Sequence, residues 1–261
     1  MIGNGWPRRP NVSRVYDYLL GVKDNYEDDR CFAEHLLAVV PDAQAAARVN
    51  RHFLARALRF AVAEVGVRQV IDIGTGLPAV CDPGQVAREL APATRVVYAD
   101  NDPVVVSHAR ALLCGDPGVC AIQGDLRDPH GILGHPELRA LIDLREPVVI
   151  LLTAVLHFIP DEDQPYPLVD AVKAAMAPGS VVVISHATTD DLSPDAVKQV
   201  QELYAQATAP AVPRSREEIA RFFDGLELVR PGIVDAACWR AGPLPARPGR
   251  ALLLGGMARK R

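Results

Sequence analysis

Long apolar runs and paired cysteines are missing from this sequence. The longest apolar stretch, residues 147–160, is shorter than the roughly 20 residues that a membrane-spanning helix needs, and His157 interrupts it. Arg8 and Arg9 are followed by no apolar segment, so no export signal is predicted. The five cysteines form no CxxC pair and are odd in number, which indicates reduced thiols. We therefore expect a cytoplasmic protein without a membrane partner.

An excess of basic charge is missing too. The formal net charge is −4, so the composition gives no electrostatic reason to expect a nucleic-acid partner. Disorder is not indicated, because 49% of the residues are apolar and 23% are charged. The length of 261 residues suits one large α/β domain with an N-terminal extension. Residues 1–10, with two prolines, two glycines and two arginines, are expected to form a flexible tail.

What the chain does have is a short β-branched apolar segment that ends in two glycines. Residues 68–73 are predicted to form a buried strand, and Gly74 and Gly76 follow it directly. Glycine lets the backbone turn sharply and lets a ligand approach closely. Asp72 places a carboxylate at the same end of the strand. In doubly wound α/β sheets, ligands bind at this carboxyl end, so we expect a binding site here.

Strand-like and helix-like segments alternate along the rest of the chain. Three helices, over residues 11–21, 28–39 and 42–65, are expected to form an N-terminal helical cap of residues 11–66. The cap would cover a core of residues 67–261 within the same domain. The strands predicted in this core are residues 68–73, 95–99, 119–123, 147–153, 181–185, 226–229 and 251–257, and its helices are 82–90, 103–113, 168–176 and two that begin at 193 and 215. This alternation predicts a three-layer α/β/α sandwich.

The glycine loop departs from a dinucleotide-binding pattern. In the GxGxxG fingerprint, the loop opens directly into a helix whose N-terminus holds a pyrophosphate. Here Ala79 takes the place of the third glycine, Pro78 precedes it, and the helix is expected to start only after Asp82, with Gln85 closing a capping box. These departures count against NAD as the cofactor.

S-adenosylmethionine carries no phosphate and suits the loop better. Asp100 follows the second strand, where a carboxylate is able to accept hydrogen bonds from both ribose hydroxyls. Asp125 follows the third strand and is a candidate acceptor for the adenine amine, with the Leu126 N–H facing a ring nitrogen. Asp125 equally fits a turn in which its side chain bonds its own backbone.

Three of these strand ends resemble the first motifs of Rossmann-like class I methyltransferases: DIGTG at 72–76, Asp100 after VVYA, and GDL at 124–126. The wider pattern is similar to a bacterial S-adenosyl methyltransferase family of unassigned substrate, on RVYDYLLG at 14–21, KDN at 23–25, GTGLP at 74–78, LHFIPD at 156–161 and RFFDGL at 221–226. The resemblance covers residues 10–239. It implies a seven-stranded, mostly parallel sheet with an antiparallel last strand, an N-terminal helical cap and S-adenosylmethionine as cofactor, but no substrate.

The residues expected to bind this methyl donor lie on the strand ends and on one polar loop. Lys23 and Asn25 are candidates for the methionyl carboxylate, which needs a cation or donors, although a solvated polar loop fits them equally well. The full set of predicted cofactor residues is Asp72, Gly74, Thr75, Gly76, Asp100, Asn101, Asp125, Leu126, Lys23 and Asn25.

Thr153 and His157, at the end of the fourth strand, are expected to face the methyl acceptor. His157 has two interpretations: a general base for a hydroxyl or amine, or a packed histidine that orients its loop. Residues 187–214 are predicted to form a lid on the substrate side, or else a structural insertion.

No metal site is expected. Asp161, Glu162 and Asp163 are consecutive in a loop and cannot all face one ion, so a solvated acidic turn is predicted. His130 and His135 lie near two aspartates without a familiar ligand spacing.

The sequence therefore predicts an enzyme that transfers a methyl group from S-adenosylmethionine to a small molecule by in-line displacement. Alignment of the nucleophile with the activated methyl group supplies most of the rate in this interpretation. A non-catalytic protein that binds the donor or its product is the first alternative, and an NAD-dependent oxidoreductase is the second. The acceptor, the acceptor atom and the oligomeric state stay open.

Overall fold

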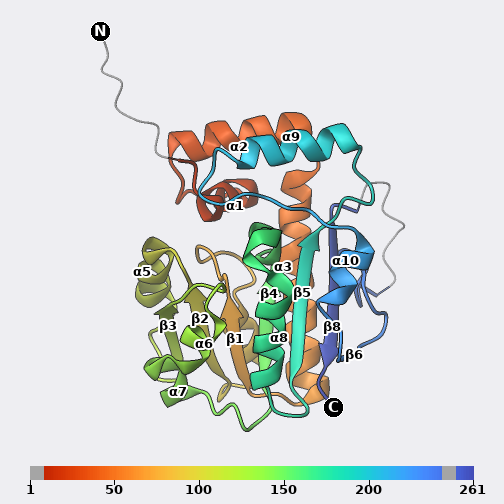
Figure 1. The fold of residues 1–261 in the computed structure, drawn as a ribbon. Helices are drawn as coiled ribbons and strands as arrows, with labels where there is room; N and C mark the ends of the chain where they lie inside the picture. Colours follow the sequence, from red (N-terminus) through yellow and green to blue (C-terminus); the bar gives the residue numbers. More distant parts are fainter. Residues whose placement is uncertain (1–8, 243–250) are drawn as a thin grey trace.

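A computed structural model describes residues 9–242 and 251–261 of the chain. The predicted flexible tail, residues 1–10, therefore lies outside the described residues except for its last two residues. One sheet runs through the molecule, and helices cover both of its faces (Figure 1). The predicted three-layer α/β/α sandwich is confirmed. Within the described ranges, no helix combines the length and the apolar character that crossing a membrane requires.

The sheet is mostly parallel and has the strand order β3-β2-β1-β4-β5-β8-β6. The last long strand runs antiparallel to both of its neighbours, as expected. The sheet has eight strands rather than seven, because the two-residue strand β7 also pairs with β8. The strands are β1 (Gln69–Ile73), β2 (Arg95–Asp100), β3 (Val119–Gln123), β4 (Val149–Thr153), β5 (Val181–Ala187), β6 (Glu227–Leu228), β7 (Val234–Asp235) and β8 (Leu253–Arg259).

Two apolar layers hold the helices onto the sheet. One face packs against α3 (Ala43–Phe60), α4 (Pro83–Leu90) and α5 (Pro103–Leu112). The other packs against α6 (Pro129–Gly134), α7 (Pro136–Leu141), α8 (Pro165–Ala175) and α10 (Arg216–Arg221). Both β1 and β4 are fully buried, and four of the five residues of β4 are apolar without interruption, as is usual for a strand covered on both faces.

The short helices α6 and α7 lie in residues 129–141, where the sequence predicted no helix. Pro129 and Pro136 occupy the first turns of these helices, where a missing N–H costs no hydrogen bond, and the Asp128 side chain caps α6. One smaller expectation was also wrong: Gln85 bonds Glu89 instead of closing a capping box. The third predicted helix does extend to Val65, with residues 61–65 in a π-helical turn.

A third apolar cluster lies above the carboxyl ends of the strands. It joins α1 (Val12–Leu20), α2 (Glu27–Val39) and α9 (Pro194–Tyr204), which lie together at one end of the sheet in Figure 1. Asn11 caps α1 by accepting hydrogen bonds from two backbone N–H groups, and Gly21 ends the helix in the left-handed conformation. The aromatic rings of Phe32 and Tyr204 meet edge to face with centroids 5.0 Å apart, which ties α2 to α9.

Candidate functional site

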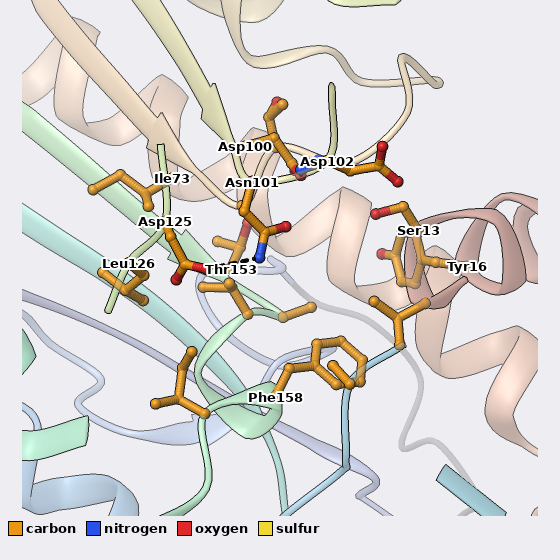
Figure 2. Close-up of a pocket in the computed structure, with 18 of the residues that line it drawn as sticks. Ser13, Tyr16, Ile73, Asp100, Asn101, Asp102, Asp125, Leu126, Thr153 and Phe158 are labelled. Carbon is orange, nitrogen blue, oxygen red and sulfur yellow. Dashed lines mark hydrogen bonds between the residues drawn. The ribbon is translucent and has the colours of Figure 1, made fainter. Parts of the chain in front are cut away.

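A cavity of about 350 Å³, here called the first cavity, lies at the carboxyl ends of β1 to β4. Eight of the predicted site residues line it: Gly74, Thr75, Gly76, Asp100, Asn101, Asp125, Leu126 and Thr153. The start of α1 and residues 208–209 complete the wall. Figure 2 shows Asp100, Asn101, Asp125 and Leu126 facing Ser13 and Tyr16 of α1 across the cavity. The sheet and the N-terminal helices therefore enclose one site together.

The glycine loop forms the floor of the first cavity. Gly74 and Gly76 have φ of +74° and +68°, in the region that side-chain-bearing residues rarely adopt. A Cβ on Gly74 would lie 2.4 Å from a methyl group of Val155, so only glycine fits this close approach of two loops. A Cβ on Gly76 would meet no atom within 4 Å, which leaves the backbone at this point open to the cavity.

Asp72 lies beneath the loop and does not line the cavity. Its side chain is buried and accepts a hydrogen bond from the Thr75 hydroxyl, 2.6 Å away. Burial raises the pKa of Asp72 to about 6, against the opposing effects of the Thr75 hydrogen bond and the Arg51 charge. Asp72 therefore braces the loop from below.

Asp100 holds the loop from the side. Its two carboxylate oxygens accept hydrogen bonds from the backbone N–H groups of Gly76 (2.9 Å) and Asp102 (3.0 Å). Burial raises the pKa of Asp100 above its ordinary value, although both N–H groups act in the opposite direction. Each carboxylate oxygen still has a lone pair, so the group is able to accept further hydrogen bonds from a ligand.

Asp125 lies in the cavity wall and also makes the local turn that its sequence allowed. It accepts a hydrogen bond from the backbone N–H of Arg127 at 2.9 Å, which makes a local turn, and it also lines the cavity. The Asn101 amide donates to its second oxygen at 3.0 Å (Figure 2). Burial alone would raise the pKa of Asp125, but the Arg127 and Asn101 hydrogen bonds bring it below its ordinary value.

The structure does not bring Lys23 and Asn25 to the first cavity. The Asn25 amide donates to the Asp17 carboxylate at 2.7 Å and to the Val22 carbonyl, and Arg30 donates to its oxygen. These bonds close the turn between α1 and α2. The side chain of Asn25 is therefore used within the N-terminal helices.

Helix α3 contributes a cation that the sequence did not single out. Arg51 lines the first cavity and is buried beside the glycine loop. Two of its N–H groups donate to the carbonyls of Val80 (2.9 Å) and Cys81 (3.3 Å), which leaves part of the guanidinium for another anion or acceptor. No local sequence signal marks this residue, because it lies in an ordinary amphipathic helix.

A polar chain crosses from α1 to the end of β4. The Tyr16 hydroxyl donates to the Ala47 carbonyl at 3.0 Å and accepts from the Asn50 amide at 2.9 Å. The Ser185 hydroxyl donates to the Asn50 side-chain oxygen and accepts from the Ala154 N–H at 2.9 Å. Ala154 itself has φ of +55°, an uncommon conformation for a residue with a side chain. These five residues fix the loop after β4 relative to the N-terminal helices.

A second cavity, of about 130 Å³, adjoins the first. It lies between α1, α2, α3 and α9, and residues of the predicted lid segment 187–214 form part of its wall. Tyr16, Ala154 and Phe158 line both cavities. Among the described residues that line the second cavity, none is Asp, Glu, Lys or Arg. The two cavities therefore meet at three residues and differ sharply in polarity.

Thr153 and His157 line different cavities. Thr153 lines the first cavity, whereas His157 lines the second. Burial, followed by the nearby Arg214 charge, lowers the pKa of His157 to about 3. An efficient general base has a pKa near the working pH, so this environment favours the packed-histidine interpretation over the general base.

The acidic turn after β4 is used for arginine pairing. Arg214, only 2% exposed, donates to the Asp161 carboxylate at 2.6 Å and to the carbonyls of Leu156 and Ile159. Asp163 accepts from Arg127 at 2.6 Å. Among the residues that the structure describes, no three His, Cys, Asp or Glu side chains are grouped to hold a metal ion.

Comparison with known proteins agrees with this arrangement. A family model described as S-adenosyl methyltransferase matches residues 7–261. A candidate methyltransferase from Thermobifida fusca YX has 38% sequence identity and a TM-score of 0.91, over 97% of this chain and 96% of its own. A DUF574 family protein from Streptomyces avermitilis MA-4680 has 35% identity and a TM-score of 0.91, over 97% of this chain and 98% of its own.

A more distant structure shares only the fold. Human N-acetylserotonin methyltransferase in complex with S-adenosylmethionine has 16% identity and a TM-score of 0.52, over 94% of this chain and 62% of its own. No curated protein matches the chain. The family match also includes residues 240–261, for which the sequence motifs gave no resemblance and which contain β8.

Proposed function

Because the chain belongs to the S-adenosyl methyltransferase family and uses S-adenosylmethionine as methyl donor, we propose that it methylates a small molecule held beside the first cavity. The observation that carries this proposal is the first cavity itself, which joins an open glycine loop to buried and partly buried carboxylates at successive strand ends. Its volume of about 350 Å³ lies in the range of ligand sites. The residues present therefore fit the donor.

The proposal gives each part of the donor its own contacts. Asp100 accepts the ribose hydroxyls on its remaining lone pairs, and Asp125 accepts the adenine amine. Ile73 and Leu126 supply the apolar surface on which the adenine ring lies. Thr75, Gly76 and Asn101 border the same space, and Asp72 supports the loop from beneath.

The methionyl carboxylate is assigned to Arg51 in place of Lys23 and Asn25. Arg51 lines the cavity beside the glycine loop and keeps N–H groups outside its two carbonyl bonds. A guanidinium is well suited to a carboxylate, because it presents several donors in one plane.

The chemistry of the reaction needs few groups from the protein. When bound, S-adenosylmethionine would supply an electrophilic methyl group, which would pass to an acceptor lone pair while the electron pair of the broken carbon–sulfur bond stays on sulfur. The protein would align the reactants through Thr153, Ala154 and Phe158, and a proton lost by the acceptor would pass to solvent. Well-oriented reactions gain about 7–11 kcal/mol from such positioning.

We also propose in which cellular compartment the enzyme acts. All five cysteines are free, and such thiols stay reduced in the cytoplasm, where we place the enzyme.

Calorimetry and methyl transfer test the proposal together. We expect S-adenosylhomocysteine to bind the protein with one site per chain, and NADH not to bind. Transfer of a labelled methyl group from S-adenosylmethionine to metabolites of a cell extract is expected. Donor binding without any transfer would indicate the non-catalytic alternative, and binding of NADH alone would indicate an oxidoreductase.

A further inference from the structure

We propose that the second cavity binds the methyl acceptor, and that it selects an uncharged molecule of about one aromatic ring with an oxygen that accepts a hydrogen bond from His157. This inference rests on the proposed function, since it names the acceptor class for the same reaction. Four observations carry it: position, size, lack of charge and one oriented donor.

Position comes first. Tyr16, Ala154 and Phe158 form a shared wall, so a molecule in the second cavity touches the same side chains as a donor in the first. Ala154 directly follows Thr153 at the end of β4, and its N–H is held by Ser185. A molecule here therefore adjoins the loop that the polar chain fixes in place.

Size and charge narrow the class of molecule. The second cavity has about 130 Å³, close to the roughly 150 Å³ of an apolar cavity that binds benzene. An ionised group inside it would lose its hydration, and no described residue of the lining would supply a charged partner, which is costly. Carboxylates, phosphates and ammonium groups are therefore excluded from this space, whereas a single neutral ring fits it.

His157 supplies a donor whose direction is fixed by a hydrogen bond on the other side of its ring. Its Nδ1 accepts a hydrogen bond from the Ala187 N–H at 3.3 Å, so a neutral ring carries its proton on Nε2. Within residues 9–242 and 251–261, the Nε2 atom makes no hydrogen bond. It is not one of the fully buried polar atoms that lack a partner, so part of its surface is accessible. Burial keeps the imidazole neutral by lowering the pKa of His157 to about 3. An Nε2–H donor in an apolar cavity favours a ligand with a hydroxyl or carbonyl oxygen.

The second cavity also has a wall on the side opposite α3, as a ligand site does. The opposite wall includes Val200 and Tyr204 of α9, and Ala211 and Pro213 follow in the same connection. This connection belongs to the segment predicted as a substrate-side lid. Its backbone is joined to the loop after β4, because the Val212 N–H donates to the His157 carbonyl at 2.7 Å.

The first experiment fills the cavity. Ala46 lines the second cavity but not the first, and the neighbouring Ala45 on α3 lines neither and is similarly half-buried. Ala46→Leu is compared with the matched control Ala45→Leu. Phenol, benzoate and benzylamine serve as probes in ligand-observed NMR titrations of the full chain with S-adenosylhomocysteine present. We expect phenol to bind wild type at millimolar concentration, to bind Ala46→Leu at least tenfold more weakly and to bind Ala45→Leu unchanged.

The second experiment tests the donor. Phenol and toluene have nearly the same size, and only phenol has an oxygen for His157. We expect wild type to prefer phenol to toluene several-fold, and His157→Phe, which keeps an aromatic ring, to lose this preference. A purely structural role of His157 would lower both affinities equally and leave the ratio unchanged.

Several outcomes overturn the inference. These are the absence of phenol binding to wild type, equal phenol binding to Ala46→Leu, binding of benzoate or benzylamine as tight as that of phenol, and a phenol-to-toluene ratio that survives in His157→Phe. The proposed function fails separately: calorimetry with S-adenosylhomocysteine alone decides it, and the phenol and toluene titrations are repeated without that compound.

Discussion

The two cavities share three residues and have opposite chemistry. The first cavity is lined by the ends of parallel strands and contains Asp100, Asp102 and Asp125 together with Arg51 and Arg127. The second is lined mainly by helices, and none of its described lining residues is Asp, Glu, Lys or Arg. Strand ends expose backbone and short polar side chains, whereas the inner faces of amphipathic helices supply apolar ones.

The two cavities meet at the end of β4 and the loop that follows it. Thr153, the last residue of β4, lines the first cavity, His157 lines the second, and Ala154 and Phe158 line both. Substitutions on the polar side should therefore change donor binding, and those on the apolar side should change acceptor binding. The predictions below test this separation, in order of expected effect.

The floor of the first cavity gives the largest predicted effect. In Gly74→Ala, the new methyl group meets Val155, and the backbone keeps its positive φ. The φ strain costs about 1–3 kcal/mol, and overpacking adds about 1–3 kcal/mol. Urea unfolding should show both losses, and calorimetry should show at least tenfold weaker binding of S-adenosylhomocysteine.

Gly66→Ala is the matched control for Gly74→Ala. Gly66 has φ of +85° and open space around it, so only the φ strain applies. Its unfolding free energy should fall by about 1–3 kcal/mol with donor affinity unchanged. Equal effects of the two variants on stability and binding would contradict the close approach of the glycine loop to Val155.

The buried Asp72 carboxylate under the glycine loop is predicted to change the free energy of unfolding by up to about 3 kcal/mol with pH. The pKa of Asp72 is raised to about 6 in the folded protein, so the folded state binds an extra proton between about pH 4 and pH 6. The contribution of Asp72 to the free energy of unfolding is therefore complete below about pH 4 and is lost as the pH rises through about 6. Asp72→Asn should be more stable than wild type at pH 7, and the difference should vanish near pH 4. A pH-independent difference in urea unfolding would contradict the raised pKa.

Removing one rim carboxylate should weaken donor binding more than removing the other. Asp100→Ala deletes hydrogen bonds to a buried charged group, each worth about 1.5–3 kcal/mol, so affinity for S-adenosylhomocysteine should fall tenfold or more. Asp125→Ala should have a smaller effect, because this carboxylate is 36% exposed and water replaces part of its bonding. Unchanged affinity in Asp100→Ala would remove Asp100 from the donor site.

The smallest effect is predicted for two tyrosines that line the second cavity. Tyr16→Phe breaks the polar chain and leaves the Asn50 amide without its partner, at about 1–2 kcal/mol. The Tyr204 hydroxyl makes no hydrogen bond within the described residues, so Tyr204→Phe should change the unfolding free energy by less than about 0.5 kcal/mol. Equal losses in the two variants would contradict the proposed role of the polar chain.

The strand-based half of the site could be predicted from sequence for a simple reason. Gly74, Asp100 and Asp125 each follow a recognisable strand, and parallel strands bring their carboxyl ends to one edge. The same logic predicted most of the order of helices and strands. It missed β7, which has two residues, and the six-residue helices α6 and α7, because such short elements have no periodicity to detect.

The helix-based half could not be predicted in this way. Asn50 bonds Ser185, 135 residues away, and no local pattern records such a partner. Asn25 shows the reverse case. Its polar loop resembles a ligand site in the sequence, but its side-chain amide donates a hydrogen bond to Asp17, eight residues earlier. The position of Arg51 beside the glycine loop likewise depends on how α3 packs on the sheet.

The start of the described chain is attached beside the first cavity. The Asn11 amide donates to the Asp102 carboxylate at 2.7 Å, the Thr208 N–H donates to the Pro10 carbonyl, and the Val12 N–H donates to the Thr208 hydroxyl. Arg261 ends the chain at the far end of the sheet (Figure 1). Purification tags and fluorescent fusions intended for activity assays are therefore better attached after Arg261 than before Pro10, because Pro10 and Asn11 are bonded to residues in the wall of the first cavity.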